Sequence, residues 1–440
     1  MLSAFLSAFR TPDLRKKLLF TVFIIAVYRF GATIPSPGVS YVAVQECIKI
    51  LDSGDQTGVF TLLNLFSGGA LLQLSVFALG IMPYITASII LQLLTVVIPR
   101  LEQLRKEGQS GQAKITQYTR YLTLALAVLQ SSAFVALARS GQLFGGAGAC
   151  PDVIPETQLG LPLTVSLLVI TMTAGTGVIM WLGELITDRG VGNGMSVLIF
   201  VSIAARLPSE GWQIAQRSAW TFVGVLAFGI LVITAVVFIE QAQRRVPVQY
   251  AKRMIGRRMY GGTSTYIPLK VNQAGVIPVI FASSLMYIPQ LALQFMDAEN
   301  PNAFYRWMNN NIVDPAKPAH IALYFLMIIF FTYFYVSITF NPTDVADNMK
   351  KYGGFVPGIR PGKPTAEYLD FILSRITLPG ALYLGIISVL PNFFIGLTGA
   401  NLQNFPFGGT AVLIIVGVGL ETVKQIESQL MQRNYEGFLR

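Results

Sequence analysis

Ionisable side chains are rare within the long apolar stretches of this 440-residue chain, and their positions limit the chemistry it can perform. Arg29 lies inside the first stretch, and the only histidine, His320, lies at a boundary. Three glutamates lie near the ends of other stretches, namely Glu184, Glu240 and Glu421. A charged group inside a membrane is costly and by default indicates a function. Because no Asp, Glu or His falls at the middle of a stretch, proton-coupled transport of a small solute is disfavoured.

Residue patterns typical of enzymes do not occur in the sequence. There is no Gly-x4-Gly-Lys-Ser/Thr phosphate-binding loop and no Cys/His group with the spacing of metal ligands, and a single histidine forms no obvious catalytic triad. The chain is therefore predicted not to be an enzyme. If it moves a substrate against a gradient, the energy must come from a partner.

Two long polar segments, about 242–270 and 342–375, are rich in Lys and Arg. The residues are Arg244, Arg245, Lys252, Arg253, Arg257 and Arg258 with Tyr250, Tyr260 and Tyr266 between them, and then Lys350, Lys351, Arg360 and Lys363. Cations spaced with aromatic rings suit a phosphate backbone or an acidic protein surface. The alternative is that they only set orientation or contact anionic lipid. Segments this long exceed what orientation needs, which favours docking of a large cytosolic partner.

The elements that must position these residues are membrane spans. Apolar residues make up 53% of the chain and charged residues 12%, about half the charged share of an average soluble domain, which is roughly a quarter. Apolar stretches long enough to cross a bilayer recur along the whole length, although the fifth is short. We place them at 18–35, 73–98, 119–138, 161–183, 194–207, 218–240, 271–296, 319–340, 376–396 and 407–425. This pattern predicts an all-α, polytopic membrane protein with ten transmembrane helices.

The distribution of positive charge predicts the topology. Of the 32 Lys and Arg residues, 25 fall in the two tails and the loops on their side of the membrane, and 6 fall in the loops on the other side. Because positive charge marks the cytosolic side, both termini are predicted to be cytosolic. Cys47 and Cys150 then lie in outer loops. A disulfide between them is one alternative, and two unpaired thiols, which so few cysteines favour, is the other.

A weak internal repeat divides the chain into two predicted halves of five spans, residues 1–207 and 208–440. Gly80-Ile-Met-Pro83 stands in the second span and Gly275-Val-Ile-Pro278 in the seventh. An odd number of spans in each half inverts the second copy relative to the first, which gives two inverted, pseudosymmetric halves. Gly and Pro weaken a helix, so we expect these two spans to line a cavity and to move. A chance repeat of Gly-x-x-Pro is the alternative.

The segment 60–72 is apolar but too short to cross the membrane. It lies between two spans on the predicted outer side. It is therefore interpreted as a re-entrant or interfacial half-helix, and the alternative is an outer loop that rests on the lipid headgroups.

Several characteristic strings of residues are spread along the chain. They are Asn64-Leu-Phe-Ser-Gly-Gly-Ala70, Phe77-Ala-Leu-Gly-Ile-Met-Pro-Tyr-Ile85, Met180-Trp-Leu-Gly-Glu184, Gly190-Val-Gly-Asn-Gly194, Lys270-Val-Asn-Gln-Ala-Gly-Val-Ile-Pro278, Phe355-Val-Pro-Gly-Ile-Arg-Pro-Gly362 and Phe407-Gly-Gly-Thr410. In these strings the chain resembles the SecY family of bacterial protein-conducting channels. The resemblance implies two halves around a central pore, hinged between spans 5 and 6. It implies a channel that translocates unfolded preproteins and releases transmembrane segments laterally into the cytoplasmic membrane.

The resemblance also implies roles for individual residues, carried over by their positions in these strings. An apolar pore ring would be formed by Ile81, Ile85, Met195, Ile199, Ile277 and Ile414, where Met195 replaces the more usual isoleucine. Segment 60–72 would be the plug, with Leu62, Leu65, Phe66, Ser67, Gly68 and Gly69. The polar positions of a lateral gate would be Thr86, Ser88, Gln130 and Asn272, and ribosome or motor contacts would be Arg257, Arg258 and Arg360.

The implied partners are SecE, SecG, the SecA motor, the ribosome (through ribosomal RNA as one contact), preproteins and membrane lipid, with no bound cofactor. Two other classes of function remain open on the residues alone. Ten spans in inverted halves also suit a secondary transporter, which needs a polar site at mid-membrane, and a scaffold that conducts nothing needs no pore.

Overall fold

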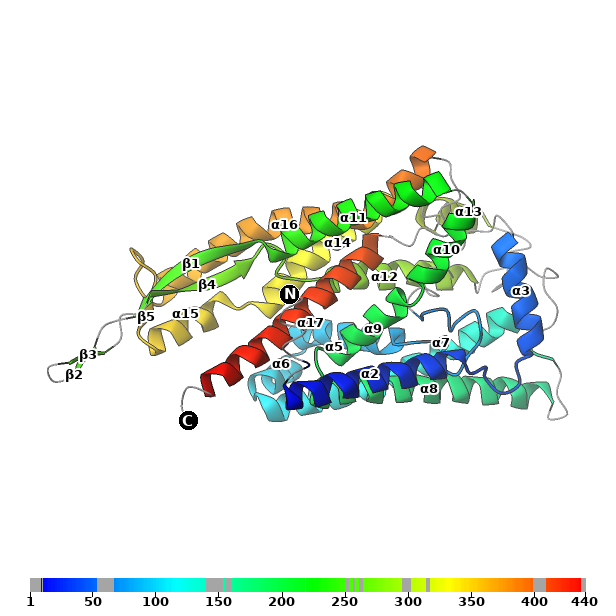
Figure 1. The fold of residues 1–440 in the computed structure, drawn as a ribbon, viewed down its shortest axis with the longest axis horizontal. Coiled ribbons are helices and arrows are strands. Elements are labelled where there is room, and N and C mark those ends of the chain that lie inside the picture. Colours follow the sequence, from blue (N-terminus) through cyan, green and yellow to red (C-terminus); the bar gives the residue numbers. More distant parts are fainter. Residues whose placement is uncertain are drawn as a thin grey trace. The chain divides into compact units, whose positions relative to one another are not determined.

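The structure is a computed structural model of the chain. It describes residues 9, 11–53, 67–139, 153–155, 160–217, 219–250, 253–255, 258–260, 264–294, 302–313, 317–398 and 409–436. These residues are mainly helical, with a small amount of β-structure within 243–355 (Figure 1).

As far as Gln241, every element of the described residues is a helix. They are α2 (Pro12–Thr33), α3 (Tyr41–Ser53), α5 (Met82–Val97), α6 (Pro99–Lys106), α7 (Gln109–Arg139), α8 (Leu161–Arg189), α9 (Gly194–Ala204), α10 (Leu207–Arg217) and α11 (Ala219–Gln241). The remaining elements include five strands. They are β1 (Gln243–Tyr250), β2 (Arg253–Ile255), β3 (Arg258–Tyr260), β4 (Ser264–Lys270), α12 (Ile277–Gln294), α13 (Ala303–Met308), the π-helical turn η2 (Asn309–Val313), α14 (Pro318–Thr339), α15 (Pro342–Lys351), β5 (Gly354–Phe355), α16 (Lys363–Thr398) and α17 (Gly409–Glu436).

A helix lies at each predicted span, namely α2, α5, α7, α8, α9, α11, α12, α14, α16 and α17. Within the described residues, α7, α8, α11, α14 and α16 are long and apolar enough to cross a membrane alone. Helices α5 and α6, bent by 100° at their junction, would add a sixth span if they form one. The chain is therefore a multi-pass membrane protein, and the number of ten crossings stays a prediction.

The chain forms two compact units. One contains Met1–Val223, Asn401–Pro406 and Val418–Arg440, and the other contains Gly224–Ala400 and Phe407–Gly417. In the first unit, α7 packs against α5 and α8, and α8 packs against α2 and α9. In the second unit, α14 packs between α12 and α16. The halves 1–207 and 208–440 predicted from the sequence stay a prediction.

The two Gly-x-x-Pro motifs begin helices, whereas the sequence predicts weak points inside longer ones. Gly80 and Gly275 have φ angles of +57° and +63°, in the left-handed region that favours glycine, and each helix begins two residues later. The proline is the second helical residue in both, where its missing N–H costs no hydrogen bond. The second and seventh spans are therefore helical only from Met82 and Ile277.

The backbone around the two helix starts is built alike. The Ile81 carbonyl accepts from the N–H groups of Tyr84 and Ile85, at 3.1 and 3.2 Å. In the second unit, one carbonyl likewise accepts from two N–H groups. The donors are Val279 and Ile280 and the acceptor is Val276, at 3.1 and 3.3 Å. The two Gly-x-x-Pro motifs therefore share local backbone structure as well as sequence.

A close contact precedes each helix start and is also repeated. Gly175 of α8 lies against the Val76 carbonyl, four residues before Gly80, and a β-carbon at Gly175 would be 2.0 Å from that oxygen. Gly380 of α16 lies against the Val271 carbonyl in the same way, and a β-carbon at Gly380 would be 2.4 Å from that oxygen. Because 3.0 Å is the closest that real β-carbons approach, only glycine fits at either position.

The non-helical chain before α5 is buried, and its polar backbone groups are bonded to the turn that follows α2. The Ser36 N–H donates to Leu74 O (3.0 Å), and the Val76 N–H donates to Ile34 O (2.9 Å). Residues 70, 71, 74, 75, 77–79 and 81–83 are all buried. Irregular backbone at membrane depth needs such internal partners, because lipid supplies none.

The contact at Gly175 can be tested by comparison with a second glycine on the same helix. Gly175→Ala should lower the free energy of unfolding by about 1–3 kcal/mol through overpacking against Val76 O. Gly177→Ala, whose β-carbon would meet only the Leu124 side chain at 3.8 Å, should be neutral or stabilise the helix by up to about 1 kcal/mol. Thermal unfolding of the purified chain in detergent measures both, and equal midpoints would contradict the predicted difference.

Candidate functional site

Four predicted pore-ring residues lie in the first unit, in two pairs. Ile81 precedes the first residue of α5 and is buried, and Ile85 follows one turn later and is half-buried. Met195 and Ile199 lie one turn apart on α9. Residues four apart share one face of a helix, so each pair presents its side chains together.

The turn Gly190–Gly194 between α8 and α9 positions Met195. Asn193 caps α9, because its side-chain oxygen accepts from the Met195 N–H at 3.1 Å. The Thr21 hydroxyl of α2 accepts from the Val191 N–H at 3.2 Å, which ties this turn to the first helix. The Met195 sulfur lies against Gly183 of α8, where a β-carbon would be 2.5 Å from Sδ.

The other two pore-ring residues lie in the second unit. Ile277 is the first residue of α12, and Ile414 is buried in α17. Gly417, one turn beyond Ile414, lies against Val276, and a β-carbon at Gly417 would be 2.7 Å from Val276 Cγ2. This contact places the two ring residues on neighbouring helices. A ring formed by all six residues stays a prediction, since they are divided between the two units.

The predicted gate residues are also divided between the units. Thr86 and Ser88 lie on α5 and Gln130 on α7, all half-buried, and these two helices pack together. The Thr86 hydroxyl donates to Met82 O of its own helix at 3.0 Å. Asn272 lies in the second unit and is buried. Their meeting at one seam stays a prediction.

Asn272 takes part in a partly buried group of polar contacts that includes a residue the sequence does not assign to the gate. Its Nδ2 donates to Glu240 Oε1 at the end of α11 (2.5 Å) and to Gly275 O at the start of α12 (3.1 Å). Its Oδ1 has no hydrogen-bond partner within the described part of the chain, and the same holds for the Tyr383 hydroxyl on α16. The sequence shows Glu240 only as a carboxylate near the end of a span, because its partner Asn272 is 32 residues away.

In the described part of the predicted plug, residues 67–72, Ser67, Ala70 and Leu71 are buried and the other three residues are half-buried. Ser67 Oγ accepts from the Leu71 N–H at 3.1 Å, and Gly68 and Gly69 have φ angles of +66° and +93°. This geometry agrees with the tight turn that small residues permit. Leu62, Leu65 and Phe66 lie outside the described residues.

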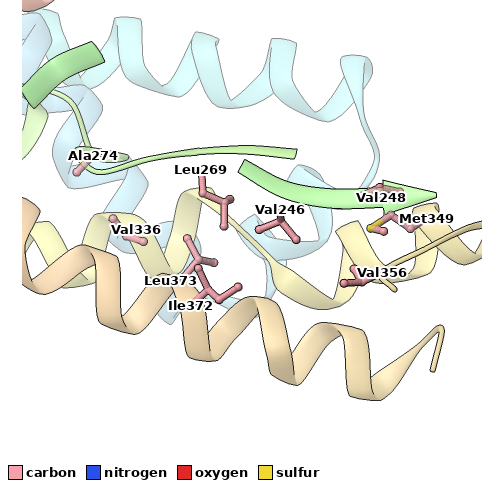
Figure 2. Close-up of a cluster of buried hydrophobic side chains, with 9 residues drawn as sticks. All are labelled: Val246, Val248, Leu269, Ala274, Val336, Met349, Val356, Ile372 and Leu373. Carbon is pink, nitrogen blue, oxygen red and sulfur yellow. The ribbon is translucent and has the colours of Figure 1, made fainter. Parts of the chain in front are cut away.

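The basic segment 242–270, which the sequence predicts as a loop, contributes β1 and β4 to a three-stranded sheet of order β4-β1-β5, whose third strand comes from the segment 342–375. It also contains the separate two-stranded sheet β2-β3. Strands β1 and β4 are antiparallel, and directly opposite residues, such as Val246 and Ile267, share one face. That face packs on α14, α15 and α16 through nine buried apolar side chains (Figure 2). These are Val246, Val248, Leu269, Ala274, Val336, Met349, Val356, Ile372 and Leu373.

The opposite face of the β1–β4 pair is exposed and carries positive charge. The Arg245 guanidinium lies over the Tyr266 ring, 4.7 Å from its centroid, and Lys270 lies at the end of β4 on the same face. The stacked ring holds the Arg245 guanidinium at the surface, where its charge is available to a partner. Sequence reasoning noted both residues but could not pair them, because it did not predict strands.

Arg360 is exposed at the end of a structured loop. The loop begins at β5, which pairs with β1, and is anchored by buried Val356. Its end is fixed by the Thr365 hydroxyl, which donates to Arg360 O at 2.9 Å. Arg258 lies in β3, opposite Ile255, and Arg257 lies outside the described residues.

The long apolar helices define a polytopic helical membrane protein, in which the two helix starts at Gly80 and Gly275 are built alike. Residues 75–423 match the SecY family model. The chain is 65% identical over 445 residues to the protein translocase subunit SecY of Streptomyces scabiei, with all of both chains covered. The chain therefore belongs to the SecY family, whose members are channel subunits and not enzymes.

Solved structures share the fold at lower identity. A SecY protein studied for its plug domain, described as stabilising the closed channel, aligns with a TM-score of 0.62 and 18% identity, over 94% of this chain and 92% of that one. Sec61 in the canine ribosome-channel complex aligns with a TM-score of 0.60 and 19% identity, over the same shares.

Removing the Asn272 side chain should destabilise the protein more than removing the side chain of the next residue, Gln273. Asn272→Ala removes the amide that donates to the half-buried Glu240 carboxylate, so the free energy of unfolding should fall by about 2 kcal/mol. Gln273→Ala is the matched control, because Gln273 Oε1 has no partner within the described residues, and it should change stability little. Thermal unfolding in detergent checks both, and an unchanged Asn272→Ala midpoint would show that the bond is dispensable.

Proposed function

We propose that the chain is the channel-forming subunit of a protein translocase. It lets unfolded preproteins cross the cytoplasmic membrane and releases transmembrane segments sideways into the lipid. The observation that carries this proposal is the full-length, 65% identity to a protein named as a translocase subunit. The 25 to 6 distribution of Lys and Arg supports cytosolic termini.

The pore is proposed to close at an apolar ring of Ile81, Ile85, Met195, Ile199, Ile277 and Ile414. Branched and thioether side chains offer no polar partners to an ion, so a narrow ring of them empties of water when no polypeptide is present. The soft methionine side chain also adapts to passing residues of different shapes. The pairing of Ile81 with Ile85 and of Met195 with Ile199 on single helix faces supports this role.

Segment 60–72 is proposed to be the plug that closes the outer side of the pore, the role named for its structural relative. Lateral release is proposed to occur at a seam lined by Thr86, Ser88, Gln130 and Asn272. Polar groups at such a seam set how apolar a segment must be before it partitions into lipid.

The proposed docking surface contains the exposed face of β1 and β4 and the Arg360 loop, with Arg257 and Arg258 on the adjoining segment. Its partners are proposed to be the SecA motor and the ribosome, the latter through ribosomal RNA as one contact, in line with the ribosome complex of canine Sec61. SecE and SecG are the proposed membrane partners, and no cofactor is proposed. A small-solute transporter and a non-conducting scaffold are less consistent with full-length identity to translocase subunits.

Transport by the reconstituted chain should depend on a motor. In vesicles that contain the chain with SecE, a preprotein should enter only when SecA and ATP are present, because the chain has no nucleotide-binding motif. Protease protection of the preprotein measures entry. Equal entry without ATP would contradict a passive, partner-driven channel.

Charge reversal at the docking loop should separate partner contact from orientation. Arg360→Glu should lower motor-driven transport roughly tenfold, because removing a cation from a polar contact and adding repulsion costs about 1.4 kcal/mol or more. Lys351 is also exposed on the segment proposed to be cytosolic, and Lys351→Glu should lower motor-driven transport much less. Membrane insertion of the chain is the control and should not change. Equal transport by both variants would assign Arg360 to orientation alone.

A further inference from the structure

A charged side chain in the first span contacts the described part of the plug. Arg29 Nη1 of α2 donates to Gly68 O at 3.2 Å. Within the described residues, the ion pairs are Lys106–Glu102 and Arg120–Glu184, and neither includes Arg29. In that part of the chain, Arg29 therefore forms no ion pair with a carboxylate. A cation in a membrane span is costly and calls for a functional reason.

Gly68 lies in a tight space between Arg29 and Ser202, and a side chain there would have to displace the Arg29 guanidinium. Its φ angle is +66°, and a β-carbon there would lie 2.8 Å from Arg29 Nη1 and 3.2 Å from both Cα and O of Ser202 in α9. Its neighbour Gly69 has a φ angle of +93°, yet a β-carbon there would meet nothing within 4 Å. The two glycines therefore share the same backbone requirement, and only Gly68 is wedged between two helices.

The two helices that hold Gly68 are fastened to each other beside it. Ser202 Oγ donates to Leu198 O at 2.9 Å, so the Tyr28 hydroxyl is the donor in the 2.6 Å bond between Tyr28 and Ser202. Tyr28 is fully buried, and its ring stacks on Phe77, with 6.0 Å between centroids. The residue before Arg29 thus fixes α2 against α9, and Arg29 lies on a rigid support.

The same part of α9 carries a proposed pore-ring residue. Ser202 follows Ile199 by three residues, so the two lie on adjoining parts of one helix face. A segment held at Ser202 is therefore held next to the constriction. In the proposed topology, α9 runs outward, which puts Ser202 on the outer side of Ile199.

We propose that Arg29 is a positioning residue that fastens the plug in the closed channel, by a charge-assisted hydrogen bond to the Gly68 carbonyl. This inference rests on the proposed role of segment 60–72. A backbone carbonyl is an acceptor that does not depend on the plug's side chains, and a single hydrogen bond holds the plug while leaving it removable. Opening then requires breaking this bond, and closing restores it.

The test is ion leak through the purified channel, with its co-purified membrane partners, in planar bilayers. Arg29→Gln should raise the frequency of spontaneous openings roughly tenfold, because a hydrogen bond to a charged group stabilises the closed state by about that factor or more. Arg29→Lys, which keeps a charged donor, should restore most of the closure. Gly68→Ala should leak more than Gly69→Ala, although both strain the same kind of backbone.

A double variant tests the contact itself. If Arg29 acts through Gly68, then Gly68→Ala should add little leak to Arg29→Gln. Deletion of residues 60–72 is the reference for the plug. If the channel that lacks residues 60–72 leaks ions but the Arg29→Gln channel does not, the inference is overturned and the proposed plug role still holds. A tight channel on deletion would overturn the plug role and the inference with it. If Arg29→Gln does not fold, equal leak by Gly68→Ala and Gly69→Ala would overturn the inference.

Discussion

The contact between a helix glycine and a backbone carbonyl is the constraint on which both units depend. At Gly175 and at Gly380, a helix approaches the preceding chain so closely that no side chain fits between them. This approach fixes Val76 and Val271, each four residues before the glycine that precedes a helix start. The positions of Ile81, Asn272 and Ile277 follow from it, since all lie within six residues of those carbonyls.

Satisfaction of backbone polar groups explains why the chain leaves the helical form only at certain places. The non-helical stretch before α5 is bonded to residues 34–36, and the one before α12 is continued from β4, where the Val271 N–H donates to Ala242 O at 3.0 Å. Lipid would leave these groups without partners, at a cost of several kcal/mol each by order of magnitude. The described residues 67–72 and Asn272, which have proposed roles in the plug and the gate, belong to these non-helical stretches.

Sequence reasoning located the helices well, because an apolar stretch of sufficient length has few other solutions in a membrane. It misplaced the starts of α5 and α12, since hydropathy does not respond to the φ angle of Gly80 or Gly275. It also missed strands β1 and β4, because each contains a proline, Pro247 or Pro268, and proline in an apolar run argues against a strand. The contacts of Glu240 with Asn272 and of Arg29 with Gly68 could not be predicted, because they join residues 32 and 39 apart through folding.

The length of α16 has a mechanical consequence. Its 36 residues span about 54 Å, well beyond the roughly 30 Å of a hydrocarbon core. The helix begins three residues after Arg360, rests against the sheet through Ile372 and Leu373, and reaches the Val271 carbonyl at Gly380. A single helix therefore contacts both the sheet and the backbone beside Asn272, so the position of the sheet and the position of that backbone are linked through α16.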